Sequence, residues 1–107
     1  MQFRELKAQV KSVEFDELRS ERDNYFEAVI TKDKMKNLTP KLKDFFGAPI
    51  WPSKKKLPPQ VEEAIKDFGG IIAGQTLYFN NHNQNVAFAM LWPWQDGKHT
   101  TVKIIQK

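Results

Sequence analysis

The clearest pattern of hydrophobic and polar residues lies in the last third of the chain. Residues 86–94 are almost wholly apolar, residues 95–98 read Gln-Asp-Gly-Lys, and residues 99–105 return to a β-prone composition. An Asp-Gly pair between two such runs is a strong hairpin signal, because both residues accept the positive φ angles of tight turns. The pattern therefore predicts two antiparallel strands, 86–94 and 99–105.

The alternation of side chains in this hairpin fits two registers. A two-residue loop (96–97) pairs Trp92 with Thr101, whereas a three-residue loop (95–97) pairs Trp92 with Thr100. The longer loop gathers the large apolar side chains of both strands on one face, namely Val86, Phe88, Met90, Trp92, Val102 and Ile104. We therefore predict the three-residue loop, with this aromatic face as the core.

The opposite face of the hairpin carries Ala87, Ala89 and Leu91. It either receives the N-terminal helix or stays a shallow surface for another chain. The aromatic face is expected to lie beneath the helices that carry Phe45 and Phe68.

Three stretches elsewhere show helical signals. Apolar residues recur at intervals of three and four from Phe3 to Val10 and predict a helix over 3–12. Residues 40–46 and 59–68 each begin beside a proline and end before a glycine, which is the usual asymmetry of helix ends. In the first of these, Thr39 suits the N-cap and Pro40 the first helical position.

Two further segments, 25–31 and 75–79, have strand composition, whereas residues 17–23 are too charged to bury and are expected to form a loop. The whole chain, 1–107, is predicted to be one α+β domain. Its antiparallel sheet has about four strands, of which the C-terminal three form a meander, and about three helices pack mainly on one face.

Composition removes several classes of chemistry. The chain has no cysteine and two histidines, so neither a disulfide framework nor a metal site is expected, and no cofactor is predicted. Its N-terminus lacks the apolar core of a signal peptide, and its longest apolar run falls short of the roughly 20 residues of a membrane span. We therefore expect a soluble cytoplasmic protein that does not enter membranes.

Two motifs suggest catalysis or nucleotide binding without completing either site. Residues 69–76 have the glycine spacing of a phosphate-binding loop, but Gln75 stands in place of its lysine, and a helix precedes while a strand follows. His82 lies in an asparagine-rich turn, and the sequence names no side chain that would orient its imidazole. No catalytic residue is predicted.

The net charge of +4 is concentrated in one segment. Residues 32–56 carry eight lysines and two aspartates. Lysine side chains contact phosphates as point charges, and a neighbouring tryptophan adds base stacking. The candidate residues for nucleic-acid or anion binding are Lys41, Lys43, Lys54, Lys55, Lys56 and Trp51. The segment contains no arginine, so bidentate reading of bases from it is excluded.

The sequence thus leaves three functional hypotheses. The first is a non-catalytic binding module whose partner is another protein, with Ile50, Trp51 and Trp94 as candidate anchors, since such side chains often carry interface energy. The second is nucleic-acid binding through the lysine-rich segment, independent of base sequence. The third is a small enzyme that uses carboxylates or His82 in a reaction that we do not name.

Overall fold

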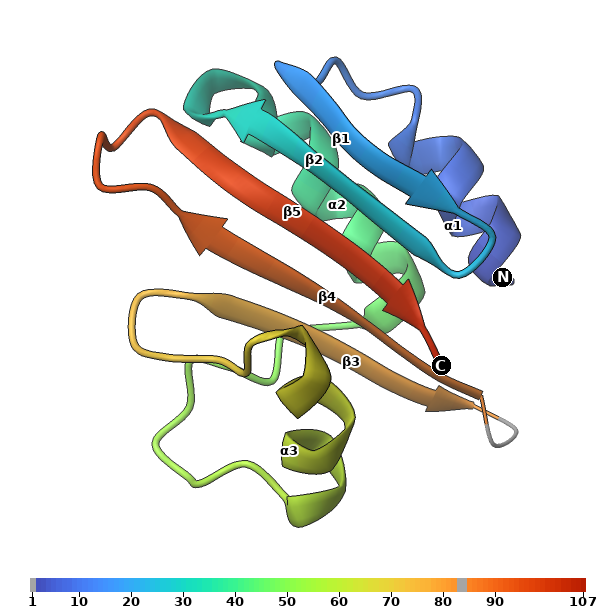
Figure 1. Ribbon diagram of the computed structural model, residues 1–107, viewed down its shortest axis with the longest axis vertical. Coiled ribbons are helices and arrows are strands. Elements are labelled where there is room, and N and C mark those ends of the chain that lie inside the picture. Colours follow the sequence, from blue (N-terminus) through green and yellow to red (C-terminus); the bar gives the residue numbers. More distant parts are fainter. Residues whose placement is uncertain (1, 83–84) are drawn as a thin grey trace.

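Five antiparallel strands form a single sheet in the computed structural model, which describes residues 2–82 and 85–107. The strands are β1 (Glu17–Arg22), β2 (Tyr25–Thr31), β3 (Thr76–His82), β4 (Asn85–Pro93) and β5 (His99–Gln106). The helices are α1 (Phe3–Val10), α2 (Met35–Phe46) and α3 (Pro59–Ile65), with short 3-10 turns η1 (Lys32–Lys34) and η2 (Lys66–Phe68). The sheet order is β1-β2-β5-β4-β3, so the α+β class and the C-terminal meander are confirmed (Figure 1).

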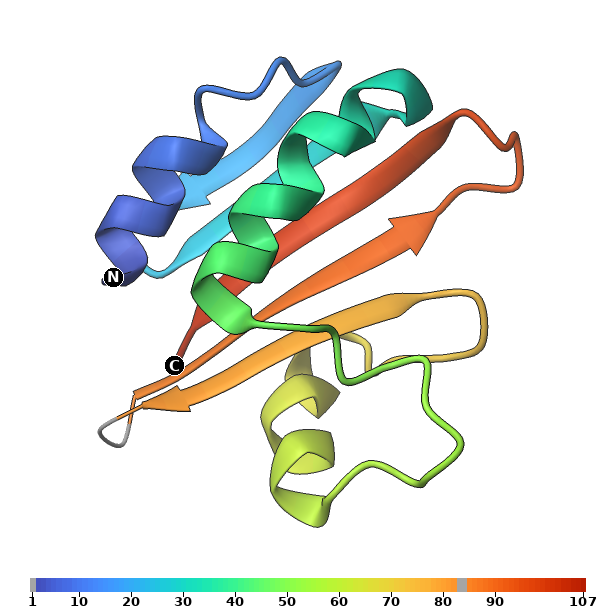
Figure 2. The ribbon, with the colours of Figure 1, turned by 180° about the vertical axis from the view of Figure 1, so that it is seen from behind.

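The helices lie on both faces of the sheet. Helices α1 and α2 lie over one face, and α3 with η2 lies on the other, with α3 beside β3 (Figures 1 and 2). Two separate clusters of buried residues fill these layers. On the α3 face, Phe68 of η2 reaches Tyr25 of β2, and Ile105 of β5 is buried in the cluster under α3.

The charged segment predicted as a loop forms the edge strand β1, so the sheet has five strands rather than about four. Its pairing with β2 shifts between Leu18 and Ser20, which marks a bulge at Arg19. An edge strand needs no buried face, and charged side chains with a bulge discourage pairing with a further chain. The high charge of this segment keeps its side chains at the surface, and this is compatible with an edge strand.

The predicted hairpin register is wrong. Trp92 pairs with Thr101, Met90 with Lys103, and the closing bond runs from the amide of Trp94 to the carbonyl of His99 at 2.8 Å. Asp96 fixes the turn because its Oδ1 accepts hydrogen bonds from the backbone amides of Lys98 at 2.8 Å and His99 at 3.1 Å. The turn thus spans four residues, 95–98, and no three-residue loop forms.

The physical reason is that both faces of this hairpin are buried. Ala87 and Ala89, together with Val102 and Ile104, form the floor of the core under α1 and α2. Small side chains on β4 allow the helices to approach the sheet closely. Phe88 and Met90 meet α3 on the other side. The expectation that Phe45 would cover the aromatic face is also wrong, since Phe45 packs on the α2 side, whereas Phe68 does contact Phe88 with ring centroids 5.6 Å apart.

Helix α2 begins earlier than predicted, at Met35, so Thr39 and Pro40 lie inside it. Pro40 has no amide hydrogen to donate to the carbonyl of Lys36. Leu38 and Leu42 are fully buried on the inner face of α2. Burial of these leucines therefore holds the helix together across the proline. At the end of η2, Gly69 has φ +100° and is a left-handed cap, at the glycine before which the predicted helix 59–68 ends.

Candidate functional site

A groove of about 730 Å³ lies between η2 and the strands β1, β2, β5 and β4. Its main lining residues are Arg22, Tyr25, Glu27, Phe68, Trp92 and Lys103. Strands β2, β5 and β4 position them in cross-strand rows: Tyr25 is opposite Ile105, Glu27 is opposite Lys103, and Lys103 is opposite Met90. Alternate residues of a strand share a face, so these rows place aromatic and charged side chains together.

Trp92 forms the wall of the groove next to η2. A Cβ atom on Gly69 would lie 2.8 Å from Cη2 of the Trp92 ring, so the backbone of Gly69 is packed directly against the indole. On the ring's face, Lys103 Nζ lies 3.8 Å from the centroid. Trp92 Nε1 is buried and has no hydrogen-bond partner within the described part of the chain. The indole is therefore held by packing and by the lysine.

Tyr25 lies on the other side of the groove. Its ring stacks on Phe68 with centroids 6.1 Å apart, and its hydroxyl donates a hydrogen bond to Glu27 Oε1 at 2.5 Å. Burial, and then the hydrogen bond to the Glu27 carboxylate, raise the pKa of Tyr25. Glu27 Oε2 also lies 3.9 Å from Arg19 Nη1. The Glu27 carboxylate is thus already engaged by two groups.

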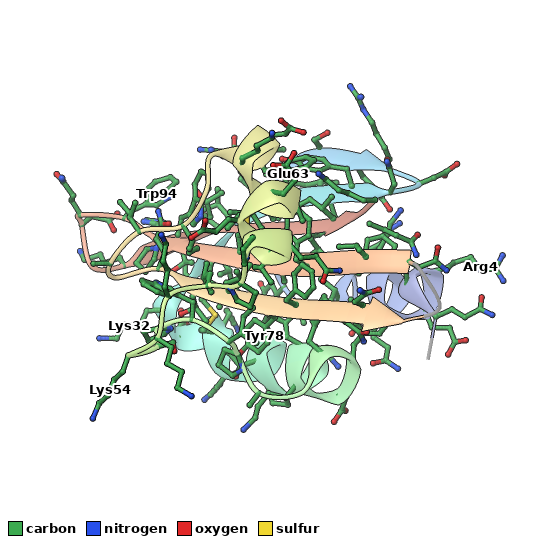
Figure 3. All side chains as sticks on the ribbon, turned by 90° about the horizontal axis from the view of Figure 1, so that it is seen from below. Arg4, Lys32, Lys54, Glu63, Tyr78 and Trp94 are labelled. Atoms are coloured by element: carbon green, nitrogen blue, oxygen red, sulfur yellow. The ribbon has the colours of Figure 1, made fainter. Side chains whose placement is uncertain are left out.

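Trp94 lies beyond the groove, on the same side of the sheet and 37% exposed (Figure 3). Its Nε1 donates to Thr101 Oγ1 at 2.8 Å, and Arg19 Cζ lies 5.5 Å from its ring centroid. Because Arg19 also approaches Glu27, it spans the open face between Trp94 and the groove. Arginine on an aromatic face and a hydrogen-bonded indole give Trp94 a fixed orientation.

His99 joins two loops near Trp94. Its Nδ1 lies 2.6 Å from Asp96 Oδ2 and its Nε2 lies 3.6 Å from Asp16 Oδ2. The backbone amide of Lys98 and then the His99 side chain lower the pKa of Asp96 to about 2. Asp96 is thereby held ionised in the turn. These contacts fix the loops that flank Trp94.

The charges of the groove are mixed and incompletely paired. Glu27 is engaged as described, and Asp67 lies 3.8 Å from Lys107 Nζ. By contrast, among the described residues no carboxylate lies within 4.0 Å of the side-chain nitrogens of Lys103 or Arg22. The groove therefore offers two cations without a carboxylate partner.

The residues predicted as sites are spread over the molecule. Lys41 lines a hollow between α1 and α2, and Lys43 is exposed on α2. Lys54, Lys55 and Lys56 surround a different hollow of about 230 Å³ together with Trp51, and Lys54 points away from the sheet (Figure 3). The structure thus brings Trp51 to the loop lysines, and the lysines of α2 line other surfaces.

Two of the predicted interface anchors have structural contacts. The backbones of Ile50 and Trp51 bond to Leu77 of β3, with amide-to-carbonyl distances from 2.8 to 3.4 Å. The Trp51 indole donates to the carbonyl of Ile72 at 3.2 Å. Both side chains are half-buried and pack against the cluster under α3. Of the three anchors, Trp94 is the most exposed.

Sequence reasoning missed the residues of the groove itself. Tyr25, Glu27 and Lys103 occupy alternate positions on β2 and β5, which is the signal that marks one sheet face. The predicted three-residue loop, however, places Lys103 on the face opposite to Trp92. The observed pairing places Lys103 on the aromatic side, so the groove can be recognised only once the register is known.

The described residues show no group of three or more His, Asp or Glu side chains placed to hold a metal ion. The side chain of His82 lies outside the described part of the structure. None of the helices in residues 2–82 and 85–107 has the length and apolar character that crossing a membrane requires. Comparison with known proteins gives no match to this chain, whether among family models, curated proteins or solved structures.

Proposed function

We propose that this protein is a non-catalytic binding module that receives a segment of another protein in the groove beside Trp92. The observation that carries the proposal is the groove itself, which combines aromatic walls with two cations that have no carboxylate partner. Binding sites are typically concave and mostly apolar, with a few convergent polar groups that fix orientation.

A polypeptide suits the groove better than a nucleic acid does. Glu27 and Asp67 lie in the groove with Arg22 and Lys103, so a chain of phosphates would meet two carboxylates. The faces of Trp92 and Tyr25 are occupied by Lys103 and Phe68, which leaves little aromatic surface for bases to stack on. A peptide carries isolated charges among apolar side chains and matches this mixed lining.

Trp94 extends the same surface beyond the groove. Its exposed ring is oriented by Thr101 and Arg19, so little side-chain freedom remains to be lost on binding. Preorganised aromatic side chains are the usual anchors of protein interfaces. The proposed interface thus runs from the groove to Trp94 across Arg19.

The test is a selection from a random-peptide display library on the wild-type protein. Selected peptides are then synthesised and titrated against Ser20→Tyr, which adds a ring inside the groove, and against Gln9→Tyr, which adds the same ring to the hollow between α1 and α2. Gln9 is exposed and Ser20 is half-buried on the edge strand β1, so urea unfolding of both variants accompanies the titrations to show that each remains folded. We expect Ser20→Tyr to weaken binding at least about tenfold and Gln9→Tyr to leave it unchanged.

Two outcomes would contradict the proposal. One is a set of peptides whose affinity is the same for wild type and Ser20→Tyr. The other is tight binding of a single-stranded oligonucleotide at about 50 mM salt that is lost when Lys54, Lys55 and Lys56 are replaced by serine, because phosphate contacts are strongest at low salt. The second result would move the functional surface to the loop around Trp51.

A further inference from the structure

We infer that Lys103 determines the specificity of the groove by binding a carboxylate of the partner segment, an aspartate or glutamate side chain. This inference rests on the proposed function and adds the chemical identity of the anchor. Lys103 lies at the centre of the open face, in one cross-strand row with Glu27 of β2 and Met90 of β4.

The carboxylate nearest to Lys103 in the sheet is turned to other partners. Glu27 is directly opposite Lys103 in the register, where an ion pair would ordinarily form. Instead, the Glu27 carboxylate accepts a hydrogen bond from the hydroxyl of Tyr25 and lies near the guanidinium of Arg19. The Lys103 ammonium lies over Trp92, 3.8 Å from the ring centroid. The Lys103 ammonium and the Glu27 carboxylate thus have different partners, although the two residues are directly opposite each other in the sheet.

The surroundings of Lys103 favour an anion from outside. The side chain is half-buried, so part of the water that would solvate its charge is excluded. A tryptophan face replaces only part of that hydration, and a carboxylate would supply the missing hydrogen-bond acceptor. Aromatic walls that exclude water also strengthen a charged contact made there. Arg22 lines the same groove and adds a second positive charge.

The same residues favour a single carboxylate over a phosphate group. Glu27 and Asp67 also line the groove, and their charges repel a doubly charged group more than a singly charged one. A phosphorylated segment is therefore the competing occupant, and the experiment must separate it from an acidic one.

The experiment uses a peptide from the display selection that binds wild type and is blocked by Ser20→Tyr. Each acidic residue of the peptide is replaced in turn by its amide, and each peptide is titrated against wild type, Lys103→Met and Lys103→Arg. Methionine keeps most of the length of the chain over Trp92 and removes the charge, whereas arginine keeps the charge. Lys41→Met is the matched control, because Lys41 is also half-buried but lies in the hollow between α1 and α2.

We expect one acid-to-amide change to weaken binding to wild type at least about tenfold and to have no further effect on Lys103→Met. Lys103→Arg keeps the positive charge and should keep the dependence of binding on that acidic residue, and Lys41→Met should match wild type. The inference would be overturned if the acid-to-amide change weakened binding to Lys103→Met as much as binding to wild type. It would also be overturned if a peptide with phosphoserine in place of the acidic residue bound wild type more tightly. If peptides whose binding is weakened by Ser20→Tyr bind equally well without any acidic residue, the inference is wrong and the proposed function still stands. If Ser20→Tyr weakens the binding of no selected peptide, both are wrong.

Discussion

Replacing Gly69 by alanine tests how Trp92 is held against η2. Gly69 has φ +100°, and an added Cβ would lie 2.8 Å from Cη2 and 3.3 Å from Cζ2 of the Trp92 ring. Its neighbour Gly70 also has a positive φ, +66°, yet a Cβ there would meet nothing within 4 Å. The two glycines therefore separate backbone strain from the steric effect of one methyl group.

The magnitudes follow from these two effects. An L residue in the left-handed region loses roughly 1–2 kcal/mol, and this loss applies to both positions. Overpacking a well-packed contact adds typically about 1–3 kcal/mol, and this applies only to Gly69→Ala. We expect Gly70→Ala to lower the free energy of unfolding by about 1–2 kcal/mol and Gly69→Ala by about 2–5 kcal/mol.

Urea unfolding followed by far-ultraviolet circular dichroism measures both values, and tryptophan fluorescence of the folded variants reports whether the indole has moved. Gly69→Ala should shift the emission, because Trp92 must move away from the new methyl group, and Gly70→Ala should not. Equal destabilisation by the two changes, with unchanged emission in both, would refute the idea that Gly69 positions Trp92.

Three further predictions concern the core, the turn and α2. Phe88→Ala should lower the free energy of unfolding by about 3–5 kcal/mol, because Phe88 is fully buried against Phe68; a loss under about 1 kcal/mol would contradict its place in the core. The pKa of Asp96 falls from 3.8 to about 2 on folding, so its contribution is present above about pH 4 and disappears toward pH 2; Asp96→Asn should show a smaller drop in urea midpoint over that range than wild type. Pro40→Ala restores an amide donor inside α2 and should stabilise the protein by about 1–3 kcal/mol, which a higher melting temperature would show.

The accuracy of the sequence predictions depended on how local each signal is. Strand β2 was predicted with its observed bounds, Tyr25–Thr31, because its composition and its charged flanks are both local. The inner face of α1, with Phe3, Leu6 and Val10 buried, was likewise predictable from spacing alone. Gly69 marked the end of η2 because few other residues accept its φ.

The errors came from properties that depend on the rest of the fold. The hairpin register depends on what covers each face, and the sequence of the hairpin does not state that α1 and α2 lie over Ala87 and Ala89. The prediction of the longer loop rested on gathering apolar side chains on one face, whereas the observed register places Lys103 over Trp92 in a favourable contact. The groove required both corrections, so it was not predictable from the pattern of the chain.

Trp51 and Leu77 form a β-bridge at the edge of the sheet. The segment between them, residues 52–76, therefore begins and ends at the same point beside β3. Helix α3, η2 and the glycine packed against Trp92 all belong to this segment, whereas Ile50 and Trp51, which also pack on that side of the sheet, come just before it. The core under α1 and α2 is built from residues outside it. Changes within residues 52–76 would therefore alter the cover of the groove and leave every residue of the core under α1 and α2 in place.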